Sequence, residues 1–279
     1  MTLTTSTAPS PQTGELILSL SGVGKRFGAV QALTDIALEV HAGEVVALVG
    51  DNGAGKSTLV KILAGVHPQD SGTVEMYGSP VTVASPSHAG ALGIATVFQD
   101  LALCDNLDVV ANLWLGHELG GGPVMDEVEM EQRSWSLLRE LSAKIPSVRT
   151  PVASLSGGQR QTVAIARSLI GDPTIVILDE PTAALGVAQT AEVLNLIDRL
   201  RERGLGVILI SHNIADVQAV ADRIVVLRLG RNNGDFRVSE VSSETIIAAI
   251  TGANDNAVTR RSARKATADG ASESIEEQQ

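Results

Sequence analysis

The stretch that decides the fold is residues 50–57, which read Gly50-Asp51-Asn52-Gly53-Ala54-Gly55-Lys56-Ser57, with Thr58 next. It has the spacing G-x-x-x-x-G-K-[S/T], in which glycine lets backbone N–H groups converge closely on phosphate oxygens. Lys56 supplies a positive charge for the β- and γ-phosphates of a nucleotide, and the Ser57 hydroxyl can bind Mg²⁺. We therefore expect residues 50–58 to bind a nucleoside phosphate from a loop between a strand and a helix.

The segments on either side of this loop predict an α/β fold. Residues 45–49 form a continuous apolar run, as expected for a strand covered on both faces, and apolar residues at helical spacing begin at Leu59. Residues 175–178 and 207–210 are two more such runs. Between about residues 15 and 252 strands of this kind alternate with helical segments, which is typical of a largely parallel sheet with crossover helices.

The middle of the chain predicts a helical subdomain over about residues 104–170. Asp126, followed three residues later by Glu129, resembles the capping box that opens a helix. Met130 and Trp135 follow at positions expected to pack inside this subdomain rather than to bind a ligand. We expect these helices to be inserted into the α/β core.

Composition limits the kinds of partner. The 279 residues carry 21 Lys and Arg against 32 Asp and Glu, a net charge of −11, and only 2% of them are aromatic. Such a surface repels nucleic-acid phosphates and offers few rings for base stacking, so we expect no nucleic-acid partner. The one cysteine, Cys104, excludes a disulfide within the chain and is expected to be a small buried hydrophobe. No apolar run approaches the ~20 residues that cross a bilayer, so we expect a soluble chain.

The two ends of the chain are expected to be disordered, outside an ordered domain at residues 15–252. Residues 1–14 are rich in Thr, Ser and Pro, and they have neither the positive charge nor the apolar core of a signal peptide. Residues 253–279 run from basic to acidic, which is typical of a solvated tail. Before that tail, Asn233-Gly234 lies between two β-rich runs and predicts the turn of a hairpin.

A second motif, at residues 174–180, is a hydrophobic strand that ends in two carboxylates: Thr174-Ile175-Val176-Ile177-Leu178-Asp179-Glu180. Asp179 at the strand end suits a Mg²⁺ ligand, usually acting through water. Glu180 then faces the γ-phosphate side, where a carboxylate can orient or deprotonate the attacking water.

A third motif begins a helix: Leu155-Ser156-Gly157-Gly158-Gln159. Such a start exposes backbone N–H groups and the positive end of the helix dipole to an anion. A second phosphate-type site so far along the chain is hard to fit into one small nucleotide pocket. It is explained if residues 156–159 serve the nucleotide bound by a partner chain.

In this order and spacing, the three motifs resemble the ATP-binding subunit of an ABC transporter, over about residues 15–252. The resemblance implies a phosphate-loop NTPase core of the RecA-like type with a parallel sheet, an N-terminal antiparallel β subdomain and an inserted helical subdomain. It also implies ATP and Mg²⁺ as cofactors, with Ser57, Gln99 and Asp179 as the residues that hold the metal.

Further roles come from the resemblance alone. Phe27 matches the aromatic residue that stacks on adenine, and Gln99 the glutamine that senses Mg²⁺ and the γ-phosphate at the joint with the helical subdomain. His212 matches the histidine that holds the γ-phosphate. Ser156 and Gly158 would contact the γ-phosphate of the opposite subunit, because the family hydrolyses ATP only as a closed head-to-tail dimer.

One position departs from the family. Gly186 stands where an aspartate commonly acts across the dimer, which puts that role in doubt here. The run 181–187 is nevertheless similar to monosaccharide importers of the ribose, xylose and fructose type. Many sugar ATPases of that group are tandem duplications, so this single cassette is expected to form a homodimer.

We therefore predict the ATPase subunit of a bacterial monosaccharide importer, with Glu180 as the catalytic base. Its expected partners are membrane permease subunits, a second copy of itself and, indirectly, a sugar-binding protein, at the cytoplasmic face of the membrane. Two other classes stay open at this point. One is a soluble ABC ATPase of DNA repair, translation or cluster assembly, and the other is a regulatory cassette that senses ATP without hydrolysing it.

Overall fold

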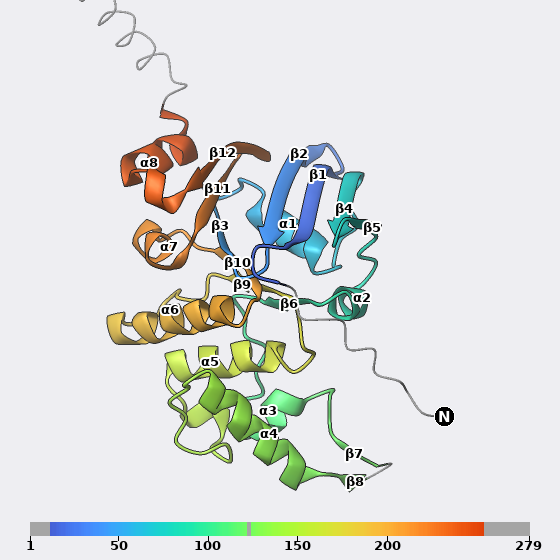
Figure 1. Cartoon of the computed structure of the whole chain (residues 1–279), viewed down its shortest axis with the longest axis vertical. Helices are drawn as coiled ribbons and strands as arrows, with labels where there is room; N and C mark the ends of the chain where they lie inside the picture. The colour runs from blue at the N-terminus through green and yellow to red at the C-terminus, as the bar shows by residue number, and fades with distance from the viewer. Residues whose placement is uncertain (1–11, 122–123, 254–279) are drawn as a thin grey trace, which may run out of the picture.

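A six-stranded sheet forms the centre of the protein. The computed structural model describes residues 12–121 and 124–253, and Figure 1 shows the arrangement. The strand order is β12-β11-β3-β10-β9-β6, and all neighbours are parallel except β11 and β12. The bounds are β3 Val45–Gly50, β6 Ile94–Val97, β9 Ile175–Asp179, β10 Gly206–Ile210, β11 Arg223–Arg228 and β12 Arg231–Arg237.

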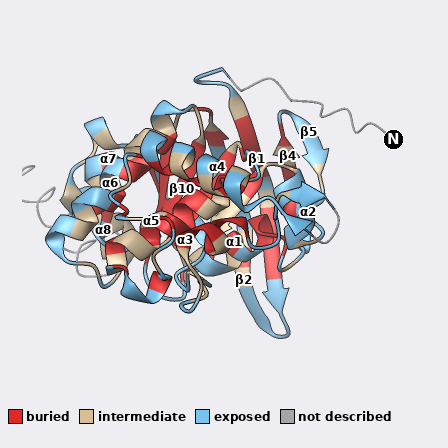
Figure 2. Cartoon of the chain, turned by 90° about the horizontal axis from the view of Figure 1, so that it is seen from below, coloured by how far each residue is buried: buried red, intermediate tan, exposed pale blue. Residues whose placement is uncertain are grey.

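The continuous apolar runs of these strands follow from burial on both faces. Along β3, Val45 and Ala47 belong to one hydrophobic core and Val46 and Leu48 to a second one. Because side chains alternate between the two faces of a strand, a strand between two cores needs apolar residues at every position. Figure 2 shows these buried residues gathered in the strands and on the inner faces of the helices. The predictions of buried strands at residues 45–49, 175–178 and 207–210 are confirmed.

A second, antiparallel sheet covers one face of the central sheet. Its strand order is β2-β1-β4-β5, with β1 Leu16–Phe27, β2 Val30–His41, β4 Ser71–Met76 and β5 Ser79–Val81. Helix α1, Lys56–Leu63, packs into the same core as both sheets through Leu59 and Ile62. The short helix α2, Pro86–Ala91, precedes β6. This sheet is the N-terminal antiparallel β subdomain that the resemblance implies.

The opposite face of the central sheet carries helices from the second half of the chain. They are α5 Gly157–Ser168, α6 Val187–Glu202, α7 Ile214–Val220 and α8 Ser243–Thr251, with a short 3₁₀ helix, η2 Val238–Glu240, before α8. In Figure 1 helix α5 runs beneath α6 and joins the central sheet to the lower part of the molecule. α5 therefore belongs to the core and to the helical subdomain at once.

A helical subdomain lies between β6 and β9. It contains α3 Val109–Trp114, the two-stranded hairpin β7 Gly120–Gly121 with β8 Val124–Met125, α4 Glu127–Glu140, the 3₁₀ helix η1 Val152–Ser154 and α5. Met130 is buried and Trp135 packs against the same core, as predicted. The indole Nε1 of Trp114 donates to the Ser134 Oγ at 2.9 Å, which fixes α3 against α4.

Half of the predicted capping box forms. The Asp126 carboxylate accepts from the Glu129 backbone N at 3.0 Å, and the helix begins at the next residue, Glu127. The Glu129 side chain does not complete the box, because Asp126 N donates to Leu119 O at 2.7 Å; the Glu129 carboxylate accepts from Arg133 Nε at 2.7 Å. Asp126 therefore caps α4 without a reciprocal contact from Glu129.

The hairpin near the C-terminal end forms, but the prediction of its turn at Asn233-Gly234 is wrong. The turn is Leu229-Gly230, with φ of 50° and 74°, and Arg228 pairs with Arg231 across it. Asn233 and Gly234 lie inside β12. The reason is tertiary: the neighbouring Asn232 side chain accepts from Ala37 N and donates to Ala37 O, both at 2.9 Å, so β12 continues along β2.

Two other expectations concern the ends and the cysteine. Most of the predicted disordered ends, residues 1–11 and 254–279, lie outside the described residues. Within the predicted N-terminal end, Gly14 is described, and its backbone N donates to Ala42 O at 2.8 Å. Cys104 is half-buried rather than buried, because it lies in a surface segment before α3. Within residues 12–121 and 124–253, no helix is long and apolar enough to cross a membrane.

Candidate nucleotide site

The predicted phosphate loop connects β3 to α1 in a backbone shape that requires glycine. Gly55 has φ of +106°, and a Cβ there would lie 2.5 Å from Leu33 Cδ2 and 3.0 Å from Ala32 O. A Cβ on Gly50 would lie 2.3 Å from Leu227 O. Both glycines are therefore needed for close packing against β2 and β11, besides any contact with a ligand.

The lysine of this loop folds back over it. Lys56 Nζ donates to Gly50 O at 2.6 Å and to Asp51 O at 3.1 Å, so the ammonium lies over the turn of the loop. Gly55 precedes α1 without a side-chain cap, which leaves the first N–H groups of the helix open to an anion. The loop thus combines a positive charge with unpaired donors.

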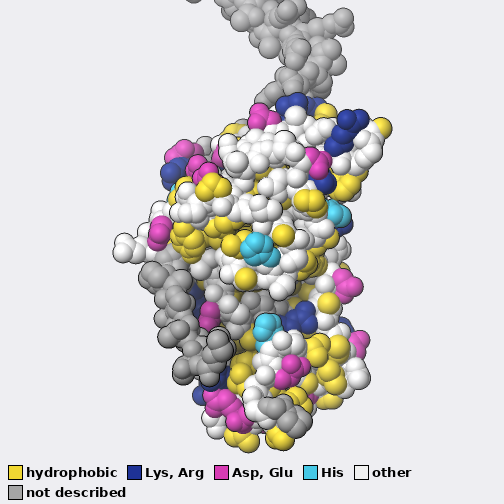
Figure 3. Space-filling view, turned by 90° about the vertical axis from the view of Figure 1, so that its right-hand side faces the viewer, with side chains coloured by type: hydrophobic (Ala, Val, Ile, Leu, Met, Phe, Trp, Pro, Cys, Tyr) yellow, Lys and Arg dark blue, Asp and Glu magenta, His cyan; other side chains and the backbone are white. Residues whose placement is uncertain are grey.

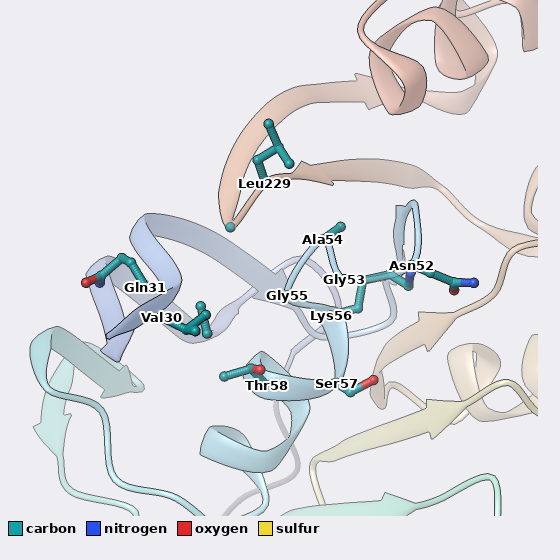
Figure 4. A pocket seen from close by; sticks show the side chains of 12 residues that line it. Val30, Gln31, Asn52, Gly53, Ala54, Gly55, Lys56, Ser57, Thr58 and Leu229 are labelled. Carbon is teal, nitrogen blue, oxygen red and sulfur yellow. The ribbon is translucent and has the colours of Figure 1, made fainter. Parts of the chain in front are cut away.

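A cavity of about 470 Å³ adjoins the loop, and Figure 4 shows its lining. Its walls come from the loop, from the start of β2 and from the β11–β12 turn: Asn52, Gly53, Ala54, Gly55, Lys56, Ser57, Thr58, Val30, Gln31, Ala32, Leu229 and Gly230. Gly50 and Asp51 do not line the cavity, and their carbonyl oxygens accept from Lys56 Nζ. This volume is in the range of small-molecule sites.

The other predicted groups reach the same edge of the sheet because the strands are parallel. The carboxyl ends of β3, β6, β9 and β10 lie side by side, and they carry the phosphate loop, Gln99, Asp179 and His212 respectively. In open α/β sheets, this edge is where ligands bind. Gln99 is exposed two residues after the end of β6.

Asp179 is the most electrostatically perturbed group at this edge. Burial raises the pKa of its carboxyl, the neighbouring charge of Glu180 raises it further, and Lys56 and Lys61 act in the opposite direction. Its charged form is therefore costly, and a cation beside it would relieve that cost. A carboxylate and the Ser57 hydroxyl are hard oxygen donors of the kind that Mg²⁺ prefers, so the residues present fit this metal.

Glu180 is held in place by His212. Glu180 has φ of +52°, a left-handed conformation that costs a non-glycine residue about 1 kcal/mol. Its Oε2 lies 2.8 Å from His212 Nδ1. The Glu180 side chain is 17% exposed and that of His212 is 73% exposed, so the carboxylate is sheltered while the imidazole faces solvent.

The segment 156–159 lies apart from the cavity. The Ser156 Oγ accepts from Gln159 N at 3.3 Å and the Gln159 Oε1 accepts from Ser156 N at 2.9 Å, a complete capping box at the start of α5. A Cβ on Gly158 would lie 3.0 Å from Gln189 Cβ of α6. The glycines here allow α5 and α6 to pack closely, and none of residues 156–159 lines the cavity of its own chain.

Phe27 also lies outside the lining. It ends β1 opposite Val30, which does line the cavity. Its ring is 43% exposed and packs edge-to-face on His67 with centroids 5.2 Å apart. Lys25 Nζ lies over the ring, 5.5 Å from its centroid, and a role of Phe27 in stacking on adenine stays a prediction.

The sequence reasoning missed the β11–β12 turn as part of the site. Gly230 N donates to Ala54 O at 3.1 Å and Gly230 O accepts from Thr34 N at 2.7 Å, so this turn braces the phosphate loop against β2. The dipeptide Leu229-Gly230 carried a weak turn signal, which the stronger Asn233-Gly234 signal obscured. Val30, Gln31 and Ala32 gave no signal of their own.

Comparison with known proteins identifies relatives of this chain. A family model described as ABC transporter matches residues 33–183. The xylose/arabinose import ATP-binding protein of Sulfolobus acidocaldarius is 43% identical over 235 residues, 84% of this chain and 94% of that protein. The fructose import ATP-binding protein of Rhizobium meliloti is 41% identical over 249 residues, 86% of this chain and 96% of that one.

Other relatives are longer. A putative ribose/galactose/methyl galactoside import ATP-binding protein of Burkholderia cenocepacia is 41% identical over 253 residues, 90% of this chain but 49% of that protein. The chain thus spans about half the length of this relative and nearly the full length of the two above.

Solved structures share the fold. An ATP-binding cassette of an ABC transporter superimposes with a TM-score of 0.75 at 25% identity, covering 84% of this chain and 98% of that one. A part of an ABC transporter complex from Clostridium perfringens gives 0.72 at 27% identity, with 90% and 99% covered. A bacterial ABC transporter cassette in dimeric form gives 0.68 at 27% identity, with 80% and 99% covered.

Proposed function

Since this chain belongs to the ABC transporter family, we propose that it is the ATP-hydrolysing subunit that powers uptake of a monosaccharide through a membrane permease. The observation that carries the ATP-hydrolysing part of the proposal is the Glu180–His212 contact of 2.8 Å, at the same sheet edge as the phosphate loop. A cassette that only senses ATP has no need of a sheltered carboxylate beside a solvent-facing imidazole. This contact favours an ATPase over a regulatory cassette.

The residues divide the chemistry among them. The phosphate loop and Lys56 would bind the β- and γ-phosphates, and Ser57, Asp179 and Gln99 would hold Mg²⁺. When bound, that ion supplies positive charge to the phosphate oxygens as the γ-phosphoryl group departs. Glu180 would accept a proton from the attacking water. In the tautomer with its proton on Nδ1, His212 donates to Glu180 and so fixes the carboxylate while its other nitrogen faces outward.

We propose that the working form is a head-to-tail homodimer. Residues 156–159 do not line the cavity of their own chain, and the capping box engages the N–H groups of Ser156 and Gln159, so those of Gly157 and Gly158 at the start of α5 would serve the nucleotide of another molecule. The dimeric bacterial cassette reported above has the same fold. Each nucleotide would then lie between the phosphate loop of one chain and residues 156–159 of the other.

The permease would dock beside the joint between the central sheet and the helical subdomain. A groove of about 620 Å³ lies there, between α2 and β6 on one side and α5 and the end of α3 on the other. Phe98 and Leu115 line it and are 36% and 47% exposed. Figure 3 shows hydrophobic side chains gathered at the middle of the face that carries α2. Docking there would hold the chain at the cytoplasmic face of the membrane.

The substrate class rests on the relatives. Proteins at 43% and 41% identity, matched over nearly their full length, are import ATP-binding proteins for xylose/arabinose and for fructose. We therefore favour a monosaccharide importer, with a sugar-binding protein as an indirect partner, over a soluble ABC ATPase.

A dilution series tests the dimeric ATPase. We expect phosphate release per chain to rise with chain concentration as monomers pair, because each site needs residues from two chains. Steady-state phosphate release and light scattering are measured on the same samples. EDTA is the control, since removing Mg²⁺ should stop release at every concentration. A constant rate per chain in samples that scatter as monomers would contradict the proposal.

A further inference from the structure

The segment that follows Gln99 is held by side chains from two helices of the helical subdomain. Near the end of α5, Arg167 donates from one terminal nitrogen to Leu101 O at 2.7 Å and from the other to Ala102 O at 2.9 Å. From α3, Asn112 accepts from Cys104 N at 2.7 Å and donates to Cys104 O at 3.0 Å. Residues 101–104 are therefore fixed by contacts 8 to 66 residues away in the chain.

The partners of Arg167 are unusual for an arginine. Burial lowers the pKa of its guanidinium, and the nearby Cys104 acts in the opposite direction. Among the described residues it forms no ion pair with a carboxylate, so the two carbonyls are its only partners there. A planar fork with donors at fixed angles orients two successive carbonyls in a way that a lysine cannot reproduce.

The backbone between Gln99 and Cys104 needs such a restraint. Ala102 has φ of +48°, a left-handed conformation that an alanine seldom adopts. The Asp100 carboxylate accepts from Ala102 N at 3.1 Å and forms a tight turn just after Gln99. Asn112, which is 0% exposed, holds the far end of the segment. Within the part of the chain that the structure describes, no hydrogen bond or ion pair holds the Gln99 side chain, so its position follows from that of residues 100–104.

We propose that Arg167 is a positioning residue, which holds residues 100–104 so that Gln99 stays at the nucleotide edge of the sheet. This deepens the proposed function and rests on it for the role of Gln99. Because α5 is a continuous helix of 12 residues that begins beside Ser156, Arg167 also joins the Gln99 segment to the segment that would contact the second nucleotide. The start of α5 would then contact the nucleotide of the other chain, and its end would hold Gln99 near the nucleotide of its own chain. The two ends would move together because the helix is continuous.

The chain carries its own probe for this contact. Cys104 is the one cysteine of the sequence and lies in the held segment, half-buried. Its rate of alkylation by iodoacetamide reports how firmly that segment is held when Arg167→Met is compared with Arg167→Lys, which keeps a positive charge near the thiol. The measurement needs no nucleotide. The matched control is Arg133→Met, which removes an exposed arginine of α4 that pairs only with Glu129.

We expect Arg167→Met to speed alkylation of Cys104 about fivefold without nucleotide, whereas Arg133→Met leaves it unchanged. In steady state, Arg167→Met should lower kcat for ATP about tenfold and leave KM within twofold, because the phosphate loop is untouched. Arg167→Lys keeps the charge but reaches the carbonyls without a fork, so intermediate values of both are expected. If Arg167 had only a structural role, Arg167→Met would lower the melting temperature. It would not lower kcat while leaving KM unchanged.

Each possible result of these measurements either supports or contradicts the role proposed for Arg167. Wild-type alkylation and kcat in Arg167→Met would show that the segment holds its place without the guanidinium. Faster alkylation with unchanged kcat would show that the segment does not position Gln99 for turnover. If Arg167→Met fails to fold, Arg167→Lys carries the test, and wild-type values in that variant overturn the proposal. A wild-type chain with no ATPase activity would contradict the proposed function alone, since the alkylation test needs no ATP.

Discussion

Replacing Glu180 by glutamine should stop turnover while ATP still binds. An amide of the same shape can keep the contact with His212, since its oxygen can accept from Nδ1, but it cannot take a proton from water. We expect kcat to fall by roughly 10²–10⁴-fold, the usual contribution of a general base, with the affinity for ATP within threefold of wild type. Phosphate release and nucleotide titration on the same preparation measure the two quantities.

The trapped complex provides a second measurement on this variant. With ATP bound and not hydrolysed, Glu180→Gln should elute as a dimer, whereas wild type returns to monomer as ATP is consumed. Glu192→Gln is the control, because Glu192 is an exposed carboxylate of α6 that pairs with Lys144 at 3.0 Å. Full turnover by Glu180→Gln would remove Glu180 from the role of base.

Replacing Lys56 by alanine should act at the earlier step of nucleotide binding. The ammonium lies over the turn of the phosphate loop, 2.6 Å from Gly50 O, and charge-assisted hydrogen bonds of this kind contribute about 1.5–3 kcal/mol each. We expect the Kd for ATP to rise about 100-fold, which corresponds to about 3 kcal/mol. Calorimetric titration with a non-hydrolysable ATP analogue measures it.

The control for this variant is on the same helix. Lys61 is exposed in the last turn of α1, and its charge also reaches Asp179, but it makes no contact with the phosphate loop. Lys61→Ala should bind the analogue with an affinity within threefold of wild type. Wild-type affinity in Lys56→Ala, or an equal loss in both variants, would contradict a direct phosphate contact by Lys56.

The strands and the phosphate loop were predictable because their sequence requirements are local. Residues 45–49 and 175–178 are apolar at every position, since each strand lies between two cores, and this pattern does not depend on knowing the neighbours. Gly50 and Gly55 occupy positions where a Cβ would clash, so the spacing of these glycines in the sequence predicts the shape of the loop. The order of these elements along the chain then predicts which strand ends meet.

The misplaced hairpin turn shows where local rules fail. Asn233-Gly234 has the stronger turn propensity, yet Leu229-Gly230 forms the turn. The pairing of Asn232 with Ala37, 195 residues away, and the contact of Gly230 with Ala54 outweigh that preference. The same limit applies to Cys104 and Arg167, whose surroundings are set by the packing of separate helices.

Gly186 stands where the family commonly has an aspartate, and the structure does not require a glycine at this position. It caps α6 with φ of −74°, is exposed, and a Cβ there would meet no atom within 4 Å. An aspartate would therefore fit, and nothing in the fold explains the glycine.

The central claim is that the chain powers a membrane permease, and purification of the tagged chain from native membranes tests it most directly. The account predicts that a multi-span permease co-purifies and that the complex releases phosphate from ATP. It also predicts that the same complex prepared with Glu180→Gln contains the permease and releases almost none. Recovery of a soluble partner alone, with no membrane protein, would contradict the importer and favour a soluble ABC ATPase.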